Sequence, residues 1–166
     1  MPAYAIDVTT GMLTILQPAL VIGPGLTQEA FRASPLGAAS EELTRNPPWL
    51  LFGFRHAEAG GERFAGHCCF HGEQVEFVTL TVERPEFGSS WAEFSKEKEK
   101  ARQEHHNTWL LTQLHDHPAT HTLWLDTPTW EWAFPWGRVY SGWDVKNGTT
   151  EIVIRYRRDG QLIEQG

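Results

Sequence analysis

The histidines are the residues of this chain whose types and spacing come closest to a catalytic pattern. His105 and His106 are adjacent, and three more histidines follow in the segment His115–His121, which reads HDHPATH. Three neutral imidazoles that converge on an open position can hold zinc and activate water. Pro118 interrupts the segment, so its last two histidines do not form a helical i,i+4 pair. We expect a His-rich polar loop without a metal, and keep one alternative, a metal-dependent hydrolase that uses His105, His115, His117 and His121.

A second group of metal-ligand types lies on a predicted strand. Because side chains alternate along a strand, His67, Cys69 and His71 share one face and Cys68 points to the other. Zinc usually takes four ligands, and the sequence has no second cysteine pair to complete a site. A disulfide between neighbouring cysteines is strained and rare, so both are expected to be thiols. We expect no metal and no cofactor here, and Cys68 in the core.

Other catalytic signatures are missing from the sequence. It contains no Gly-x-Ser-x-Gly, no phosphate-binding Gly-Lys-Ser/Thr loop and no dinucleotide fingerprint. Nothing beside Cys69 in the sequence indicates the positioned base or the lowered pKa that a thiol nucleophile needs. We therefore expect no catalytic residue, and a protein that works by binding.

The composition favours a protein-binding domain over a nucleic-acid-binding one. Twenty-one acids against 14 Lys and Arg give a formal net charge of −7, whereas phosphate binding needs clustered cations. An acidic surface steers basic partners instead, and eight tryptophans argue against disorder. The thiols suit a reducing compartment, the first residues lack a signal-peptide pattern, and no apolar run is long enough to span a bilayer. We expect a cytoplasmic protein that contacts neither nucleic acid nor a membrane.

Turn signals and alternating apolar residues predict a series of hairpins around one long helix. Gly60-Gly61 and Gly72-Glu73 separate three strands of a meander. The predicted elements are a hairpin over Ala5–Leu16, a short helix capped by Thr27 and ended by Ser34-Pro35, strands Trp49–Glu58, Glu62–His71 and Gln74–Glu83, a helix over Trp91–Leu114, an irregular segment His115–Pro128, and a final hairpin of Trp130–Asp144 with Thr150–Arg157.

The turn of the final hairpin is predicted at Asn147-Gly148, because both residues tolerate positive φ. A two-residue turn there pairs Trp143 with Ile152. It also sets Asp144 opposite Glu151, an unfavourable like-charge pair that a bulge would shift.

The long helix is expected to begin after Ser89-Ser90 and to lay one face on the sheet. Residues three and four apart define that face: Trp91, Phe94, Lys98, Ala101, His105, Trp109 and Thr112. The opposite, solvated face carries Glu93, Lys96, Glu97, Lys100 and Glu104. The meander, the C-terminal hairpin and this helix predict a single α+β domain over residues 1–166, with a mainly antiparallel sheet and one long amphipathic helix packed on it.

Several motifs of the chain together carry a resemblance to a known family. The first motif is Pro85–Ser95 (PEFGSSWAEFS), followed by Glu97-Lys98-Glu99 and Arg102. The others are Phe134–Ser141 (FPWGRVYS), then Asp144, Lys146 and Gly148, then Ile152–Tyr156 (IVIRY), with Pro24–Thr27 and Phe31–Leu36 near the N-terminus. These motifs resemble a family of small bacterial proteins, some of which are immunity proteins that neutralise polymorphic or type VI secretion toxins. The likeness covers most of the chain in order, and residues 115–130 depart from it as a longer insertion rich in His and Trp.

The resemblance implies a non-catalytic inhibitor that binds a cognate protein toxin, such as a type VI secretion nuclease, and occludes it stoichiometrically. An acidic protein suits a basic nuclease cleft. We expect acidic groups to steer the partner and tryptophans to anchor it. The partner-binding residues predicted in this way are Glu83, Glu86, Glu93, Glu97, Glu99, Trp124, Trp130 and Trp132. A further alternative is a non-catalytic scaffold subunit that forms a homodimer through a sheet edge or an aromatic patch.

Overall fold

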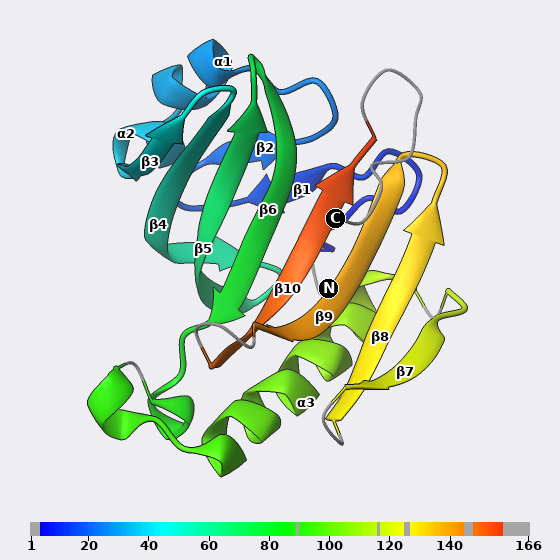
Figure 1. Cartoon of the computed structure of the whole chain (residues 1–166). Coiled ribbons are helices and arrows are strands. Elements are labelled where there is room, and N and C mark those ends of the chain that lie inside the picture. Colours follow the sequence, from blue (N-terminus) through cyan, green and yellow to red (C-terminus); the bar gives the residue numbers. More distant parts are fainter. Residues whose placement is uncertain (1–3, 89, 116, 125–126, 145–147, 158–166) are drawn as a thin grey trace.

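Figure 1 shows the computed structural model of the chain, which describes residues 4–88, 90–115, 117–124, 127–144 and 148–157. Eight strands form one antiparallel sheet in the order β3-β4-β5-β6-β10-β9-β8-β7, and β1 and β2 form a separate two-stranded sheet. The strands are β1 (Leu13–Ile15), β2 (Leu20–Ile22), β3 (Glu41–Asn46), β4 (Trp49–Ala59), β5 (Glu62–His71), β6 (Gln74–Val82), β7 (Thr120–Trp124), β8 (Thr127–Phe134), β9 (Gly137–Asp144) and β10 (Thr149–Tyr156). The helices are α1 (Gln28–Ala33), α2 (Pro35–Ala38) and α3 (Lys96–Gln113), with the 3-10 turns η1 (Pro85–Phe87) and η2 (Trp91–Glu93).

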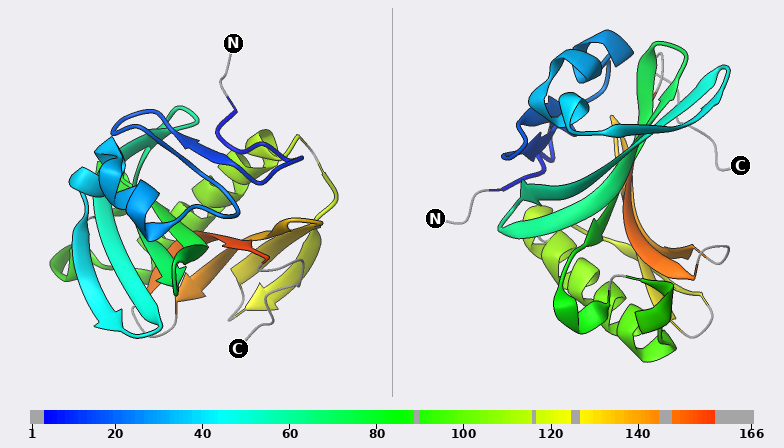
Figure 2. Two further views of the ribbon diagram at one scale, coloured as in Figure 1. Left: turned by 90° about the horizontal axis from the view of Figure 1, so that it is seen from above. Right: turned by 90° about the vertical axis from the view of Figure 1, so that its left-hand side faces the viewer.

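One face of the twisted sheet carries the other layer of the fold. The views in Figures 1 and 2 place β1, β2, α1, α2 and α3 on this face. Phe31 of α1 packs against Phe52, with ring centroids 4.8 Å apart, and Trp109 of α3 packs edge-on against Phe64 at 5.0 Å. The core therefore lies between the sheet and these elements.

The α+β architecture predicted from the sequence is confirmed, including the meander and the long helix on an antiparallel sheet. Strands β4, β5 and β6 begin at the predicted residues and pair in sequence. The side chain of Thr27 accepts a hydrogen bond from Ala30 N and caps α1, and Ser34 ends that helix. These are local signals, in which turn glycines and a capping hydroxyl act on their immediate neighbours.

Three predicted segments differ from the structure. Residues 130–144 form two strands instead of one, because Pro135-Trp136 turn the chain between β8 and β9. The segment expected to be irregular contains β7 and the start of β8. The N-terminal turn at Thr10-Gly11 leads to a single bridge between Ile6 and Leu13, and β1 pairs with β2 instead.

The final hairpin forms where it was predicted, with a different register. Asp144 pairs with Thr149, and Ile152 pairs with Ser141 instead of Trp143. In this register Glu151 pairs with Gly142 rather than with Asp144, which avoids the like-charge pair. Residues 145–147 lie outside the described part, and Gly148 adopts a φ of 69°.

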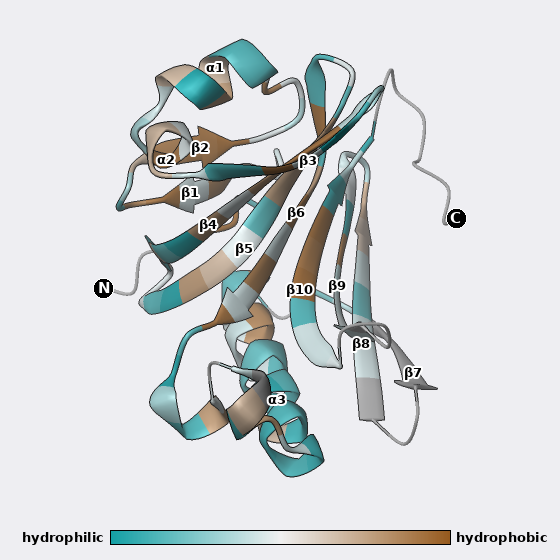
Figure 3. Ribbon diagram, turned by 60° about the vertical axis from the view of Figure 1, so that its left-hand side comes forward, coloured by the Kyte–Doolittle hydropathy of each residue, from teal (hydrophilic) through white to brown (hydrophobic). Residues whose placement is uncertain are grey.

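The long helix begins later and buries a different face than predicted. Ser95, not Ser89-Ser90, is its N-cap and accepts a hydrogen bond from Lys98 N. Figure 3 shows that α3 is hydrophilic along most of its length. Its buried residues are Glu99, Arg102, Gln103, His106, Asn107, Trp109, Leu110 and Gln113. The helix therefore packs on the sheet through a largely polar face, which apolar spacing cannot predict.

Candidate functional site

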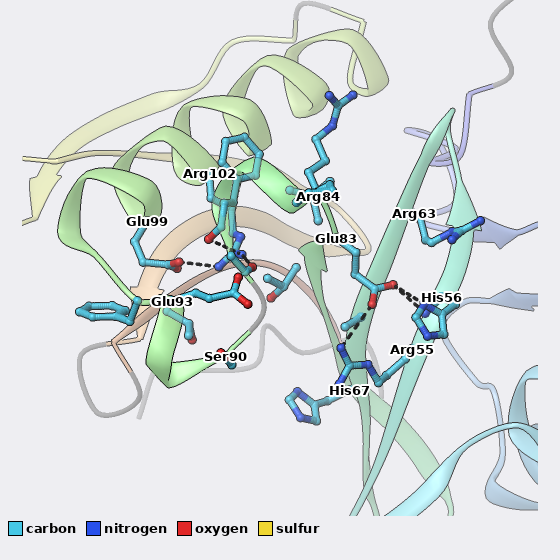
Figure 4. Close-up of a pocket in the computed structure, with 18 residues that line it drawn as sticks. Arg55, His56, Arg63, His67, Glu83, Arg84, Ser90, Glu93, Glu99 and Arg102 are labelled. Carbon is cyan, nitrogen blue, oxygen red and sulfur yellow. Dashed lines mark hydrogen bonds and ion pairs between the residues drawn. The ribbon is translucent and has the colours of Figure 1, made fainter.

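A cleft opens where the ends of β4, β5 and β6 meet the η1–η2 segment and the start of α3 (Figure 4). Its volume is about 930 Å³, near the upper end of the range typical of ligand pockets. Four arginines and three glutamates line it, so the lining carries one net positive charge in a chain whose net charge is −7. Its arginine, histidine and glutamate side chains are Arg55, His56, Arg63, His67, Glu83, Arg84, Glu93, Glu99 and Arg102.

The wall formed by the sheet is shaped by a bulge in β4. The register of β4 on β5 shifts between Phe54 and Ala57, and the intervening Arg55 and His56 lie at the cleft. His56 has a φ of 60°, a left-handed conformation that is uncommon for a residue with a side chain. Glu83 of the neighbouring segment holds it there, since its Oε1 accepts a hydrogen bond from His56 N at 2.7 Å. Bulges of this kind redirect side chains, and this one places the Arg55 guanidinium and the His56 imidazole at the cleft.

The opposite wall is held in place by a buried guanidinium. Arg102 Nη1 donates to Glu99 Oε2 at 2.5 Å, and Nη2 donates to the carbonyls of Phe87 and Gly88 at 3.1 and 2.6 Å. The other oxygen of Glu99 accepts from Thr150 N at 3.0 Å. Both charged side chains are buried. This pair ties α3 to η1 on one side and to β10 on the other, which fixes the wall relative to the sheet.

A second ion cluster fastens α3 to the meander beside the cleft. Arg84 Nε and Nη2 donate to the two oxygens of Glu62 at 3.2 and 2.9 Å, and His105 Nε2 lies 2.8 Å from Glu62 Oε1. Burial acts to raise the pKa of Glu62, but the hydrogen bonds from Arg84 and His105 outweigh it, so this pKa lies below its ordinary value. The hydrogen bond with Glu62 raises the pKa of Arg84.

Behind this wall, α3 contacts the sheet through an uncharged histidine. Val82 N donates to His106 Nε2 at 3.0 Å, so the neutral ring carries its proton on Nδ1. His106 is fully buried, and this burial, together with the nearby Arg102 and His105, lowers its pKa to about 3. The side chain of Ser141 is hydrogen-bonded to Asn107 farther along the helix. Glu99, His106 and Asn107 of α3 thus each have a hydrogen-bond partner on the sheet, while His106 Nδ1 has none among the described residues.

The cleft also contains an apolar contact surface. Phe94 lines it with 41% of its surface exposed, and Phe87 lines it as a half-buried residue. Phe94 lies between η2 and the N-cap Ser95, outside the helix proper. An exposed aromatic ring beside charged groups is typical of a residue that anchors a partner.

The predicted acidic residues lie at or near this cleft, but one of them is buried. Glu83 and Glu93 line it, Glu86 is exposed and lies 3.7 Å from Arg84, and Glu97 is exposed in the first turn of α3. Glu99 was expected on the surface, but it is only 3% exposed and its carboxylate is occupied by the interactions described above. That expectation is wrong, because Glu99 lies on the buried polar face of the helix.

The predicted tryptophan anchors lie elsewhere. Trp132 of β8 is fully buried, and its Nε1 donates to the His117 carbonyl at 3.0 Å. Trp130 is half-buried and stacks on Trp132 with ring centroids 5.9 Å apart. Strands β9 and β10 separate β8 from the cleft side of the sheet. Trp132 is therefore a core residue rather than an anchor, and the side chain of Trp124 lies outside the described residues.

The histidines proposed for a metal site are not brought together in the described part of the chain. His105 belongs to the cluster with Glu62, His115 stacks on Tyr4 at 3.8 Å, and His117 Nδ1 donates to a backbone carbonyl at 2.7 Å. The side chain of His121 is not among those described. No group of three or more His, Cys, Asp or Glu that could hold a metal ion occurs within the described residues.

The cysteines are thiols that both lie in the interior. Cys68 is in the core as predicted, and Cys69 is also buried on the other face of β5. Burial, followed by the nearby charge of Glu76, raises the pKa of the Cys69 thiol to about 11. A thiol with this pKa is protonated at neutral pH.

The sequence did not indicate the sheet wall and the exposed aromatic residue of the cleft: Arg55, His56, Arg63, His67 and Phe94. The pair Arg55-His56 places two polar residues in succession in a strand that is otherwise mostly apolar, and such a break in the pattern is a signal of a bulge. Phe94 was assigned to the buried helix face because the helix was predicted to begin too early.

Strand β3 forms one edge of the sheet, with all six residues exposed. Its charges and the register shift between Glu42 and Thr44 are devices that oppose edge-to-edge pairing. Among the helices that the structure describes, none has both the length and the apolar character needed to cross a membrane. Comparison of the chain with protein-family models, with curated proteins and with solved structures gave no match.

Proposed function

We propose that this chain is an immunity protein that binds a cognate secreted toxin, such as a type VI secretion nuclease, and that the charged cleft is its docking surface. One observation carries the proposal. Pro85–Ser95, one of the two main motifs that carry the resemblance to immunity proteins, supplies much of one wall of the cleft. The motif residues Glu99 and Arg102 hold that wall in place.

The rim of the cleft offers charge complementarity to a basic toxin surface. Glu86, Glu93 and Glu97 are exposed around it, and the whole chain carries a net charge of −7. Long-range attraction of this kind accelerates encounter and fixes orientation, while the closely packed centre of an interface determines how slowly the complex dissociates. Phe94 is the aromatic residue suited to that central role.

Neutralisation by occlusion needs no chemistry from the inhibitor. It requires a preformed surface, because ordering a loop on binding lowers affinity. The two ion clusters, Glu99 with Arg102 and Glu62 with Arg84, hold the cleft walls in the unbound chain. The proposed function therefore rests on a rigid, charged cleft with one exposed aromatic ring.

Co-expression tests this proposal. The protein encoded by the gene beside this one is expressed in cells with the parent chain, with Phe94→Ala/Glu93→Lys, or with the control Leu43→Ala/Glu41→Lys. The control removes an apolar side chain of similar exposure, 47% for Leu43 against 41% for Phe94, and an exposed acid, both from β3. The parent and the control should restore growth, and the cleft variant should not. Loss of protection in both variants, or in neither, would contradict the assignment of the cleft, and a neighbouring protein that neither harms cells nor binds the parent chain would contradict the function.

A further inference from the structure

The sheet wall of the cleft differs in charge from its rim. Arg55, His56, Arg63 and His67 line this wall, and Glu83 is the carboxylate that lines it from the same side (Figure 4). Because the chain as a whole is acidic, this wall is a local reversal of charge. A partner surface that carried only basic residues would be attracted to the acidic rim and repelled by the arginines of the wall.

Two of the four cleft arginines are already committed to internal carboxylates. Arg102 is buried against Glu99, and Arg84 makes two hydrogen bonds to Glu62. Their guanidinium groups serve as supports for the walls. The other two arginines that line the cleft are Arg55 and Arg63.

Arg55 and Arg63 have donors left for a ligand. Their side chains are 65% and 57% exposed, and their carboxylate partners, Glu83 and Glu58, lie at 3.7 Å, longer than a direct hydrogen bond. A guanidinium group presents a planar fork of donors that fits a carboxylate with two parallel hydrogen bonds. Both groups therefore have the exposure and the geometry to bind a carboxylate from outside.

The backbone under this wall is set before any ligand arrives. Glu83 uses Oε1 to hold His56 N, which keeps the bulge of β4 in its left-handed conformation. Arg55 is the other residue of the bulge. Binding a ligand to a cation on a fixed backbone loses less conformational entropy than binding it to a cation on a mobile loop.

We propose that Arg55 and Arg63 bind carboxylate side chains of the partner protein, so that the cleft takes a segment of the toxin that bears acidic residues while the acidic rim contacts basic residues around it. This inference rests on the proposed function and specifies the chemistry of the segment that enters the cleft.

Peptide titration followed by NMR tests this chemistry without the toxin. The probes are a hexaglutamate peptide, a hexalysine peptide and a single-stranded oligonucleotide. Hexaglutamate should shift the side-chain resonances of Arg55 and Arg63 in the parent chain, and hexalysine should not. Arg55→Gln/Arg63→Gln should weaken hexaglutamate binding about three- to tenfold, as expected for two exposed ion pairs. The control Arg32→Gln/Arg45→Gln removes two arginines of similar exposure beside Glu42 and should bind like the parent.

The outcomes separate this inference from the proposed function. Equal hexaglutamate binding by the parent and the Arg55/Arg63 variant would overturn the carboxylate site, and so would preferential binding of the oligonucleotide at the same residues. Neither result depends on whether the neighbouring gene product is a toxin. If the parent chain and the Arg55→Gln/Arg63→Gln variant protect cells equally well, the carboxylate site is contradicted and the proposed function is not.

Discussion

Glu83 accepts a hydrogen bond from the backbone nitrogen of His56 at 2.7 Å, and His56 is held at a φ of 60°. The carboxylate also lies 3.3 Å from His56 Nδ1 and 3.7 Å from the Arg55 guanidinium. One side chain thus connects the last residues of β6 to the bulge of β4. The cationic wall of the cleft depends on this link.

A double-mutant cycle measures that link. Glu83→Ala should lower the free energy of unfolding by about 1 kcal/mol, the usual value of one hydrogen bond. In a His56→Gly background the loss should be smaller, because glycine adopts positive φ without a steric penalty. Urea unfolding of the four proteins gives the coupling. Equal losses in both backgrounds would mean that Glu83 does not restrain the bulge.

The buried pair Glu99–Arg102 gives a second prediction. Arg102→Met should lower the free energy of unfolding by roughly 3–5 kcal/mol, because it leaves a carboxylate buried without its counter-charge. Glu99→Leu/Arg102→Met should cost less than Arg102→Met alone, since neither charge then remains. Denaturant titration compares the two. A double variant that is less stable than Arg102→Met would contradict this prediction, and would mean that Glu99 stabilises the fold through Thr150 N even without Arg102.

His106 predicts a dependence of stability on pH. Its pKa is about 3 in the fold and about 6.5 in the unfolded chain, so below pH 6.5 the unfolded state binds the additional proton. The contribution is therefore complete above pH 6.5 and is lost as the pH falls toward 3, by up to about 1.4 kcal/mol per pH unit. The free energy of unfolding, measured at pH 7, 5.5 and 4.5, should fall less steeply with decreasing pH in His106→Gln than in the parent chain. Glutamine keeps an acceptor for Val82 N. Parallel slopes would contradict a buried, uncharged His106.

Association kinetics test the acidic rim. Charge reversal of Glu93 and Glu97 should slow association with the toxin roughly tenfold at low salt and flatten its salt dependence, because salt screens such attraction over about 8–10 Å. Dissociation should change little. The control reverses Glu29 and Glu41, which are exposed on α1 and β3, Glu29 also in the first turn of its helix. Stopped-flow measurements at two salt concentrations give the association rate constants. Identical rate constants for the rim variant and the control variant would mean that the rim is a solvated surface without a role in association.

The parts of the fold that the sequence predicted depend on short-range signals. Thr27 caps the helix that follows it, and Gly60-Gly61 turn the chain between β4 and β5. Strand β3 was missed because its six residues are all exposed and have no apolar alternation. The meander of β4, β5 and β6 was therefore predicted from the sequence, and the edge strand β3 was not.

The candidate site was predicted only in its acidic half. Glu83 and Glu93 were identified from the charge pattern, and both line the cleft. Glu99 looked like its exposed neighbours, because a buried polar helix face has no signature in apolar spacing. Arg55 reaches the cleft through a bulge of β4, and Glu83, which holds this bulge, lies 27 residues from His56 in the sequence.

Amide hydrogen exchange is the most direct measurement for the central claim that the toxin docks in the cleft. The free chain and its complex with the neighbouring gene product are compared peptide by peptide. The account predicts new protection over residues 84–95 and 55–67, with none over β3 or β8. Protection confined to β7 and β8, with the cleft segments unchanged, would contradict it and would assign the docking surface to the insertion at residues 115–130.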